Sequence, residues 1–416
     1  MRETKNLELK ENISNTFLKT VTAFANYDGG KVIFGVADNG EVTGLSDTTE
    51  SALVIEQKIN DSISPKIDYS INIDEQTNTI ELTVYPGNQV PYFYRSKTYK
   101  RNDSSTIEVD HYELKRLILE GENQTFDALV SSKNNLKFTY LEKKLKEIVG
   151  IESVDRDVLK TLELMNKDEL FTNAGSLLAD QNEFNIIDIV RFGEDQDRIF
   201  SRYQIKNVSI LEAYDLAVEK YREYYQFEMV KGAYREKKEL IPENAFREVV
   251  ANALVHRDWM RPSYIQISMN HQDISVGSPG GLPKELSEEE YLESQISMMR
   301  NPIVGNVFFR LDIIESFGTG IRRIKNSYKS SKKKPLFKIY ENSIEITLPF
   351  ISGVEELSDD QNLIFSALEN KALPSSTLSE LTGFGKNKVL ELLESLINLG
   401  YVKKIGSGRG TKYIRR

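Results

Sequence analysis

The chain has 416 residues, a net charge of -9 and no cysteine. It is longer than one hydrophobic core usually grows, which predicts about two to four domains. The lack of cysteine excludes disulfides, thiolate zinc sites and thiol nucleophiles, so a metal would need oxygen ligands or one of the three histidines. The acidic balance excludes a protein that coats nucleic acid over its whole surface, so any such contact must be local.

The N-terminal sequence MRETKNLELKENISNTF has no apolar run of the kind found in a signal peptide. Nor does any segment approach the ~20 apolar residues that a membrane-spanning helix needs. We therefore expect a cytoplasmic protein without a membrane partner.

The first segment, residues 1–120, alternates helical and strand-like patterns. Apolar residues recur at helical spacing over residues 13–26. The runs KVIFGVAD (31–38), SINI (70–73) and TIELTVYP (79–86) are typical of strands, and turn-forming Gly, Asn, Asp and Pro separate them. This order predicts a small α/β domain.

The motifs LELK, AFANYDGG and GVADNGEVTG resemble the AlbA-like domain of Schlafen proteins and bacterial regulators. In Schlafen nucleases three carboxylates cleave RNA, and the resemblance implies Glu3, Glu8 and Asp38 at those positions. Carboxylates in threes can hold metal ions for phosphodiester hydrolysis. Glu8 alternates with two leucines, so it is expected to point away from the core, and an ordinary surface carboxylate is the other interpretation. Binding of RNA, single-stranded nucleic acid or a partner by this domain stays open.

The sequence pattern over residues 121–240 predicts helices and a strand pair, NIIDIVRF and SRYQIKNVSI. The run EAYDLAVEKYREYYQF has charged residues on one face and Leu, Ala, Val and Tyr on the other. We interpret it as a solvated connecting helix. This region is expected to lead into the domain that follows.

From residue 241 the predicted order is a helix (242–257), two strands (263–270 and 273–279) and a Gly/Pro loop. A long irregular stretch follows. A glycine turn then enters a helix (317–328), and the strands FKIY and SIEITLPF close the segment.

Glu248, Asn252 and His256 recur at every fourth position of REVVANALVHRDW, so they share one helix face. A carboxylate and an amide oxygen one turn apart suit Mg²⁺, which keeps most of its waters. The other interpretation is a polar stripe that faces solvent. Downstream, Gly318 and Gly320 directly precede a helix, where free N–H groups and the helix dipole favour phosphate.

Together with ISVGSPGGLP and PLFKIYENSIEITLPF, these segments resemble the GHKL-type ATP-binding fold of histidine kinases, gyrase B and MutL. The closer resemblance is to a divergent branch, labelled the C-terminal part of a RecG-like protein, in predicted transcriptional regulators. It implies ATP and Mg²⁺ as ligands. Asn252 would chelate the metal, and Glu248, near it, would polarise the attacking water in a weak ATPase reaction.

By the same resemblance, Gly318, Thr319 and Gly320 would wrap the phosphates. The other nucleotide-binding residues expected are Asp273, Gly277, Gly280 and Gly281. The family reads adenine with Asp-x-Gly-x-Gly, whereas this chain has SVGSPGG at that position. Either adenine is read differently or the base is another one, so hydrolysis is a weaker expectation than binding.

The end of this helix, His256 with Arg257 and Asp258, is interpreted as a structural terminus that braces a lid over about residues 286–301.

The C-terminal segment is the basic end of an acidic chain. Three helices followed by a hairpin around GSGRG predict a winged helix-turn-helix. Its recognition helix would present Lys386, Asn387 and Lys388 to DNA bases, and Arg409 would lie at the tip of the wing. Lys403, Lys404 and Lys412 would contact phosphates. Use of this domain for protein contact or dimerisation is the other interpretation.

The sequence thus predicts an α+β multidomain protein. Its expected parts are an AlbA-like α/β domain (1–120), a connecting region (121–240), a GHKL-type α/β sandwich (241–352) and a winged helix (353–416). The function we expect is that of an ATP-binding, DNA-binding transcriptional regulator that forms a homo-oligomer. The alternative is a metal-dependent nuclease, gated by ATP and used in defence against foreign DNA.

Overall fold

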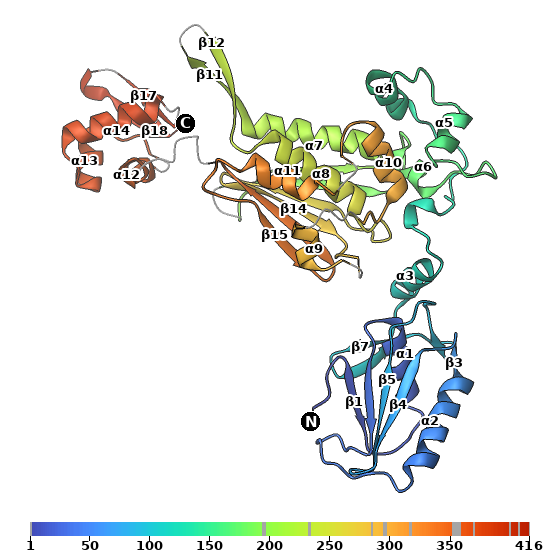
Figure 1. Ribbon diagram of the computed structural model, residues 1–416. Helices are drawn as coiled ribbons and strands as arrows, with labels where there is room; N and C mark the ends of the chain where they lie inside the picture. The colour runs from blue at the N-terminus through green and yellow to red at the C-terminus, as the bar shows by residue number, and fades with distance from the viewer. Residues whose placement is uncertain are drawn as a thin grey trace.

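The computed structural model describes residues 2–193, 197–231, 234–283, 286–293, 298–315, 318–351, 359–368, 371–398, 401–406 and 408–415. Over these ranges the chain forms three bodies, each with its own cluster of buried apolar side chains (Figure 1). The mixed α+β, multidomain fold predicted from the sequence is confirmed. Among the described helices, none has the length and apolar content to cross a membrane.

The N-terminal body is built on a sheet with the strand order β1-β2-β5-β4. Its strands are β1 (Leu7–Lys10), β2 (Gly30–Phe34), β4 (Tyr69–Asp74) and β5 (Thr79–Val84). β1 is parallel to β2, and the other neighbours are antiparallel. The strand predicted over 31–38 ends at Phe34, because Gly35 takes a φ of 86°, which is incompatible with an extended strand.

Two helices pack against this sheet, α1 (Phe17–Asn26) and α2 (Thr48–Ser62). Helix α2 was not predicted, since only Ile55 and Ile59 are buried and its apolar stripe is therefore narrow. The short strands are β3 (Ile63–Ser64), β6 (Phe93–Tyr94), β7 (Tyr99–Asn102) and β8 (Ser105–Glu108). Helix α3 (His111–Gly121) leads out of this body toward the central one (Figure 1).

The central body is a six-stranded sheet with the order β10-β9-β13-β14-β16-β15. Its strands are β9 (Asn185–Phe192), β10 (Ile199–Lys206), β13 (Ile265–Met269), β14 (Asp273–Pro279), β15 (Leu336–Tyr340) and β16 (Ser343–Pro349). β13 is parallel to β9, and every other neighbouring pair is antiparallel. The helices α7 (Ile210–Tyr225), α8 (Glu243–His256) and α11 (Gly320–Ser327) lie over this sheet in Figure 1.

The boundary expected at residue 240 falls inside this body. β9 and β10 precede it, yet they belong to the same sheet as β13 to β16. One cluster of buried apolar residues runs from Phe138 to Leu348. The pairing of β9 with β13 joins segments that are distant in sequence, so local patterns could not reveal it. We therefore propose one domain in place of the two regions 121–240 and 241–352.

The interpretation of the run in α7 as a solvated connecting helix is wrong. Its apolar face is buried, including Ala217 and Tyr221, and it packs on α8. The rings of Tyr221 and Phe246 stack with their centroids 4.8 Å apart. The sequence identified the charged face of α7 correctly, but it did not show that α8 packs against this helix.

Smaller elements complete the central body. They are η1 (Phe126–Ala128), α4 (Thr139–Ile148), α5 (Arg156–Thr161), α6 (Asn173–Leu178), β11 (Gln226–Lys231), β12 (Tyr234–Glu239), α9 (Glu288–Glu293) and α10 (Pro302–Arg310). Helices α9 and α10 lie in the stretch that was expected to be irregular. β11 and β12 form a hairpin that projects from the body (Figure 1).

The C-terminal body has the order expected for a winged helix. It consists of α12 (Asp359–Ala367), α13 (Ser375–Thr382), α14 (Lys386–Asn398), β17 (Val402–Ile405) and β18 (Lys412–Arg415). β17 and β18 pair antiparallel, and Leu373 adds a bridge to Tyr413. Its core is separate from that of the central body.

Asp127 joins the early and late parts of the central domain. Its buried Oδ2 accepts hydrogen bonds from the backbone N–H groups of Ile303 (2.8 Å) and Val304 (3.1 Å), at the first turn of α10. It caps a helix that lies far along the chain.

Replacing Asp127 with Ala should therefore lower the free energy of unfolding by about 2 kcal/mol, since two buried N–H groups lose their acceptor. Urea denaturation of the full chain measures this loss. Asp127→Asn keeps one oxygen acceptor and should lose less than half as much. Equal stability of Asp127→Ala and the unsubstituted chain would contradict the proposed link.

Candidate nucleotide site

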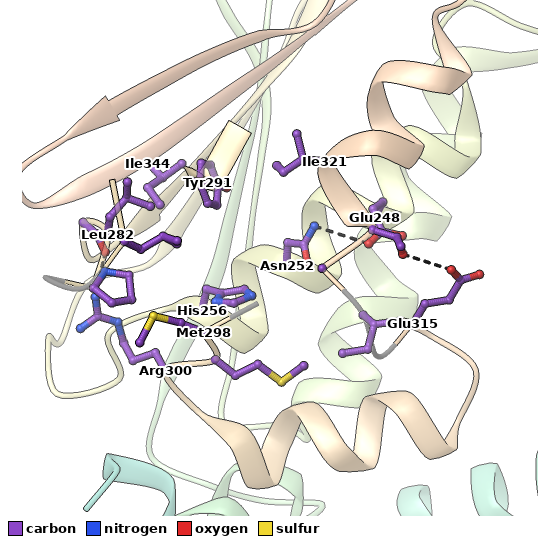
Figure 2. Close-up of a pocket in the computed structure, with 18 residues that line it drawn as sticks. Glu248, Asn252, His256, Leu282, Tyr291, Met298, Arg300, Glu315, Ile321 and Ile344 are labelled. Atoms are coloured by element: carbon purple, nitrogen blue, oxygen red, sulfur yellow. Dashed lines mark hydrogen bonds between the residues drawn. The ribbon is translucent and has the colours of Figure 1, made fainter. Parts of the chain in front are cut away.

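Glu248, Asn252 and His256 project from one face of α8 into a common cavity (Figure 2). The cavity measures about 60 Å³. Its other walls are the loop after β14, the segment around α9, the turn before α11, and β16. Glu248 is only 6% exposed, so the polar row faces this cavity and not bulk solvent.

The carboxylate of Glu248 lies between an amide and a guanidinium. Asn252 Nδ2 donates to Glu248 Oε1 at 3.5 Å, and Arg323 Nη1 lies 3.3 Å from Glu248 Oε2. Burial raises the pKa of the Glu248 carboxyl above its ordinary value, and the nearby guanidinium of Arg323 opposes that shift. The protonation of Glu248 in this site therefore depends on the position of the Arg323 guanidinium.

The glycine turn before α11 lies directly against Glu248 and Asn252. A Cβ atom on Gly320 would stand 2.6 Å from Glu248 Oε1 and 2.7 Å from Asn252 Nδ2, so a larger residue there would have to displace these two side chains. Thr319, the N-cap, makes no side-chain cap bond, and its hydroxyl donates instead to Glu315 Oε2 at 3.1 Å. The Thr319 side chain therefore accepts no hydrogen bond from the first backbone N–H groups of α11, and these groups can bind an anion.

The loop after β14 forms the opposite wall. Gly280 has a φ of 107°, and a Cβ atom on Gly281 would stand 2.2 Å from the Glu341 carbonyl oxygen. Gly281 lines the cavity, and Gly280 lines two adjoining ones. The fold itself thus favours glycine at both positions, and their contact with nucleotide stays a prediction.

Two of the predicted nucleotide residues lie elsewhere. Asp273 begins β14 at the end away from the cavity, where its carboxylate accepts from Asn270 Nδ2 at 2.8 Å. Gly277 does not line the cavity, and a Cβ there would meet no atom within 4 Å. Ser278 lies nearer, and its hydroxyl donates to the Ala253 carbonyl oxygen at 3.1 Å.

The end of α8 combines a half-buried imidazole with a structural brace. Burial and the charge of Arg300 lower the pKa of His256 to about 4, so it is neutral near pH 7. Arg257 is buried, donates to the backbone carbonyls of Asn185 and Ser263, and lies over the Trp259 ring. Arg257 therefore fixes the helix end, as expected, whereas His256 also lines the cavity.

The expected lid, Leu286 to Asn301, has two described segments, 286–293 and 298–301. Each of them is hydrogen-bonded to a neighbouring helix. Asn301 is buried, and its amide donates to the carbonyls of Val255 (2.7 Å) and Arg257 (2.8 Å) at the end of α8. Lys325 of α11 donates to the Leu292 carbonyl at 3.0 Å. Residues 294–297 of the lid lie outside the described residues.

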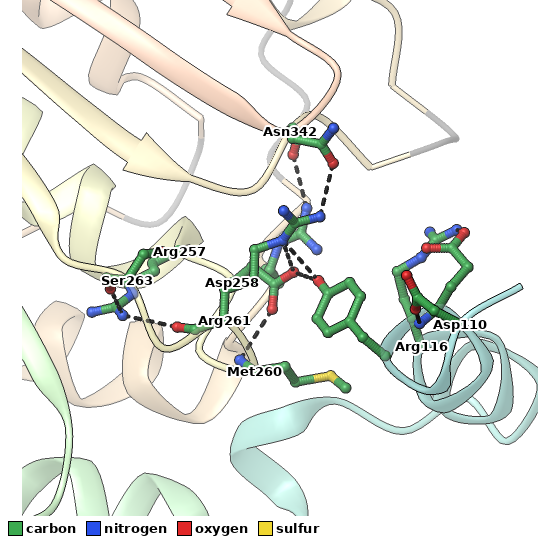
Figure 3. Close-up of polar contacts among 12 residues, drawn as sticks. Asp110, Arg116, Arg257, Asp258, Met260, Arg261, Ser263 and Asn342 are labelled. Carbon is green, nitrogen blue, oxygen red and sulfur yellow. Dashed lines mark hydrogen bonds and ion pairs between the residues drawn. The ribbon is translucent and has the colours of Figure 1, made fainter.

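The N-terminal and central bodies meet at the residues that follow α8 (Figure 3). The hydroxyl of Tyr112 on α3 donates to Asp258, and Arg261 Nε donates to that hydroxyl at 3.1 Å. Arg261 also donates to Asn342 Oδ1 at 2.8 Å. A cavity of about 700 Å³ lies beside this cluster and shares Gly281 and Arg300 with the smaller one.

Glu3 and Glu8 come together in the N-terminal body, but as partners of cations. Glu8 is 7% exposed and pairs with Lys10 (2.7 Å) and Arg101 (2.5 Å). Glu3 Oε1 accepts from the Leu9 backbone N–H at 3.0 Å. Asp38 lies in an exposed turn.

This arrangement contradicts the interpretation of Glu8 as an ordinary surface carboxylate. Glu8 is not a surface carboxylate, because β7 brings the buried guanidinium of Arg101 against it. Among the described residues, no group of three His, Asp or Glu side chains could hold a metal ion. The three-carboxylate set of Glu3, Glu8 and Asp38 stays a prediction.

The residues expected to contact DNA lie at two places in the C-terminal body, the start of α14 and the β17–β18 hairpin. Lys386, Asn387 and Lys388 are exposed at the start of α14, where Lys388 pairs with Asp360 at 2.7 Å. Lys403 and Lys412 lie on the outer face of the hairpin. Lys404 is on the other face, opposite the buried Tyr413. Arg409 follows β17 in η2 (Gly408–Gly410), and its side chain lies outside the described residues.

Sequence reasoning missed Glu315 and Arg323, which meet at 3.5 Å beside the glycine turn. Both lie within the segment ESFGTGIRRI (315–324), and a charged residue on each side of a phosphate-type turn was an available signal. Their partners on α8 are remote in sequence and could not be read from it.

The acidic residues of the N-terminal body give a direct test. Glu8→Gln should destabilise the chain by about 3–5 kcal/mol, because it leaves the buried Arg101 without its counter-charge. Asp38→Asn, in an exposed turn, should change the free energy of unfolding by less than about 0.5 kcal/mol. Chemical denaturation of both variants measures the difference. A Glu8→Gln chain as stable as Asp38→Asn would contradict this structural role.

Two segments match known families. Residues 3–110 match the family described as "Schlafen, AlbA_2". Residues 263–348 match the family described as "Putative ATP-dependent DNA helicase recG C-terminal". The second match begins after α8, so Glu248 and Asn252 lie outside it. No curated protein matches the chain.

A solved structure, the DIP2311 protein from Corynebacterium diphtheriae, shares the fold at 18% identity and a TM-score of 0.50. The alignment covers 99% of this chain and 92% of that one. The N-terminal domain of a putative ATP-dependent DNA helicase RecG-related protein from Nitrosomonas europaea aligns at 19% identity and a TM-score of 0.20, over 27% of this chain and 88% of that one. The N-terminal segment of the chain is thus similar to the Schlafen, AlbA_2 family, and a segment of the central body is similar to the recG C-terminal family.

Proposed function

We propose that the chain is an ATP-binding, DNA-binding transcriptional regulator. In this proposal, nucleotide with Mg²⁺ at the α8 cavity changes how the C-terminal domain engages DNA. The observation that carries it is the close approach of the Gly318–Gly320 turn to Glu248 and Asn252. A helix start, a carboxylate and an amide oxygen thereby share one cavity.

The donor atoms suit a hydrated metal on a triphosphate. Mg²⁺ takes only one or two protein oxygens when phosphates and water supply the others. The Glu248 carboxylate and the Asn252 amide oxygen would hold it, and the bound ion would neutralise phosphate charge. The N–H groups at the start of α11 would receive the phosphates.

Weak hydrolysis fits the same residues. A carboxylate has two oxygens, so Glu248 could contact the metal with one and a water with the other. Glu248 would then position and deprotonate a water next to the terminal phosphate. The carboxylate expected to read adenine, Asp273, lies away from the cavity, so we do not assign the base.

The lid offers a route from this cavity to the rest of the chain. Tyr291 of α9 lines the cavity, Lys325 joins α9 to α11, and Asn301 joins the end of the lid to α8. A ligand that binds one lid position better than another shifts the population of that position. The contact between Asp258 and Tyr112 would extend this effect to the N-terminal body.

A nuclease function is not favoured. Its carboxylates would have to hold metal, whereas Glu8 is neutralised by Lys10 and Arg101, and Asp38 lies in an exposed turn. Local nucleic-acid binding by the N-terminal body remains compatible with the "Schlafen, AlbA_2" match.

Mg²⁺ with ATP should stabilise the chain against thermal unfolding. At about 100 times the Kd the expected gain is roughly 2.7 kcal/mol. Differential scanning fluorimetry with ATP, ADP and GTP, each with and without Mg²⁺, measures the shift. Asn252→Ala should abolish most of it. The nucleotide proposal fails if no nucleotide raises the melting temperature of the unsubstituted chain.

The two faces of the hairpin predict different effects on DNA binding. Removing Lys403 and Lys412 together should reduce the slope of log K against log salt by about 2, or about 1 for each lost phosphate contact. Lys404→Ala, on the core-side face, should change the slope by less than about 0.5. Fluorescence anisotropy with a labelled duplex across a salt series gives these slopes. Equal slopes for all three proteins would argue against phosphate contact by this hairpin.

A further inference from the structure

Arg323 occupies an unusual place for a cation. It lies in the first turn of α11, where the helix dipole disfavours positive charge. Its side chain remains 46% exposed and reaches Glu248 Oε2 at 3.3 Å and Glu315 Oε1 at 3.5 Å. The contacts with two carboxylates, and not helix stability, account for its position.

The two carboxylates flank the glycine turn. Glu248 comes from α8, and Glu315 lies before the turn, where it also accepts from Thr319 Oγ1. Without Arg323, the negative charges of Glu248 and Glu315 would both lie beside the start of α11, where the phosphates would bind. With it, the local charge of these three groups falls from two negative charges to one.

The contact of Arg323 with Glu248 competes with metal binding. Glu248 Oε1 already lies within contact distance of the Asn252 amide, and Arg323 approaches Oε2. A cation that binds both Glu248 and Asn252 must therefore displace the guanidinium or share the carboxylate with it. Guanidinium groups pair strongly with phosphate as well as with carboxylate.

We propose that Arg323 is a positioning residue that senses the terminal phosphates. In the free protein it pairs with Glu248 and Glu315. When a nucleoside triphosphate enters with Mg²⁺, the guanidinium moves to its phosphates and leaves Glu248 to the metal. The proposal rests on the nucleotide function proposed above and adds to it a preference for triphosphate over monophosphate.

Calorimetric titration of the full chain with ATP and AMP, both in Mg²⁺, tests this exchange. Arg323→Gln should weaken ATP binding about tenfold or more, the loss expected for one charge-assisted contact, and change AMP binding less than about twofold. Arg323→Lys keeps a point charge and should recover part of the ATP affinity. Lys329→Gln, which removes an exposed charge just beyond the same helix, is the matched control and should leave both affinities unchanged.

Two results would overturn the proposal. They are an unchanged ATP affinity in Arg323→Gln and an equal loss of ATP and AMP affinity. If Arg323→Gln fails to fold, Arg323→Lys carries the test, and it must lose ATP affinity selectively. Failure of the nucleotide function itself would appear differently, as no binding of any nucleotide by the unsubstituted chain.

Discussion

The structure depends on one close contact, that of the start of α11 with the polar face of α8. Gly320 allows the backbone to lie against Glu248 and Asn252, where any Cβ atom would stand less than 3 Å from both side chains. This contact brings a helix start, a carboxylate and an amide into one cavity. It also explains why α8 can carry polar groups on a face that is largely buried, since the groups meet each other and Arg323.

The surrounding fold holds α8 from every side. α7 packs behind it, the sheet lies beneath it, and Arg257 ties its end to the carbonyls near β9. Asn301 and Asp127 attach the lid and α10 to the same framework. Asn301 is thereby bonded to the end of α8, next to the junction where Asp258 meets Tyr112 of the N-terminal body.

The sequence predicted local features well. The spacing of Glu248 and Asn252 gave one helix face, and the glycines at 281 and 320 marked two close backbone approaches. It did less well where the answer depends on distant partners. Arg101 converts Glu8 into a structural residue, and β9 joins the sheet from a segment assigned to a connecting region. Asp273 was misplaced because β14 is extended, so a few residues of chain carry it away from the cavity.

The central claim is that the α8 cavity and the C-terminal domain are coupled. Its most direct test is the Kd for a labelled duplex of mixed sequence, at one salt concentration, with and without saturating Mg²⁺ and ATP. The account predicts that nucleotide changes this Kd by about fivefold or more, and that Asn252→Ala removes the change. An identical Kd in both conditions, for a chain that demonstrably binds ATP, would contradict it.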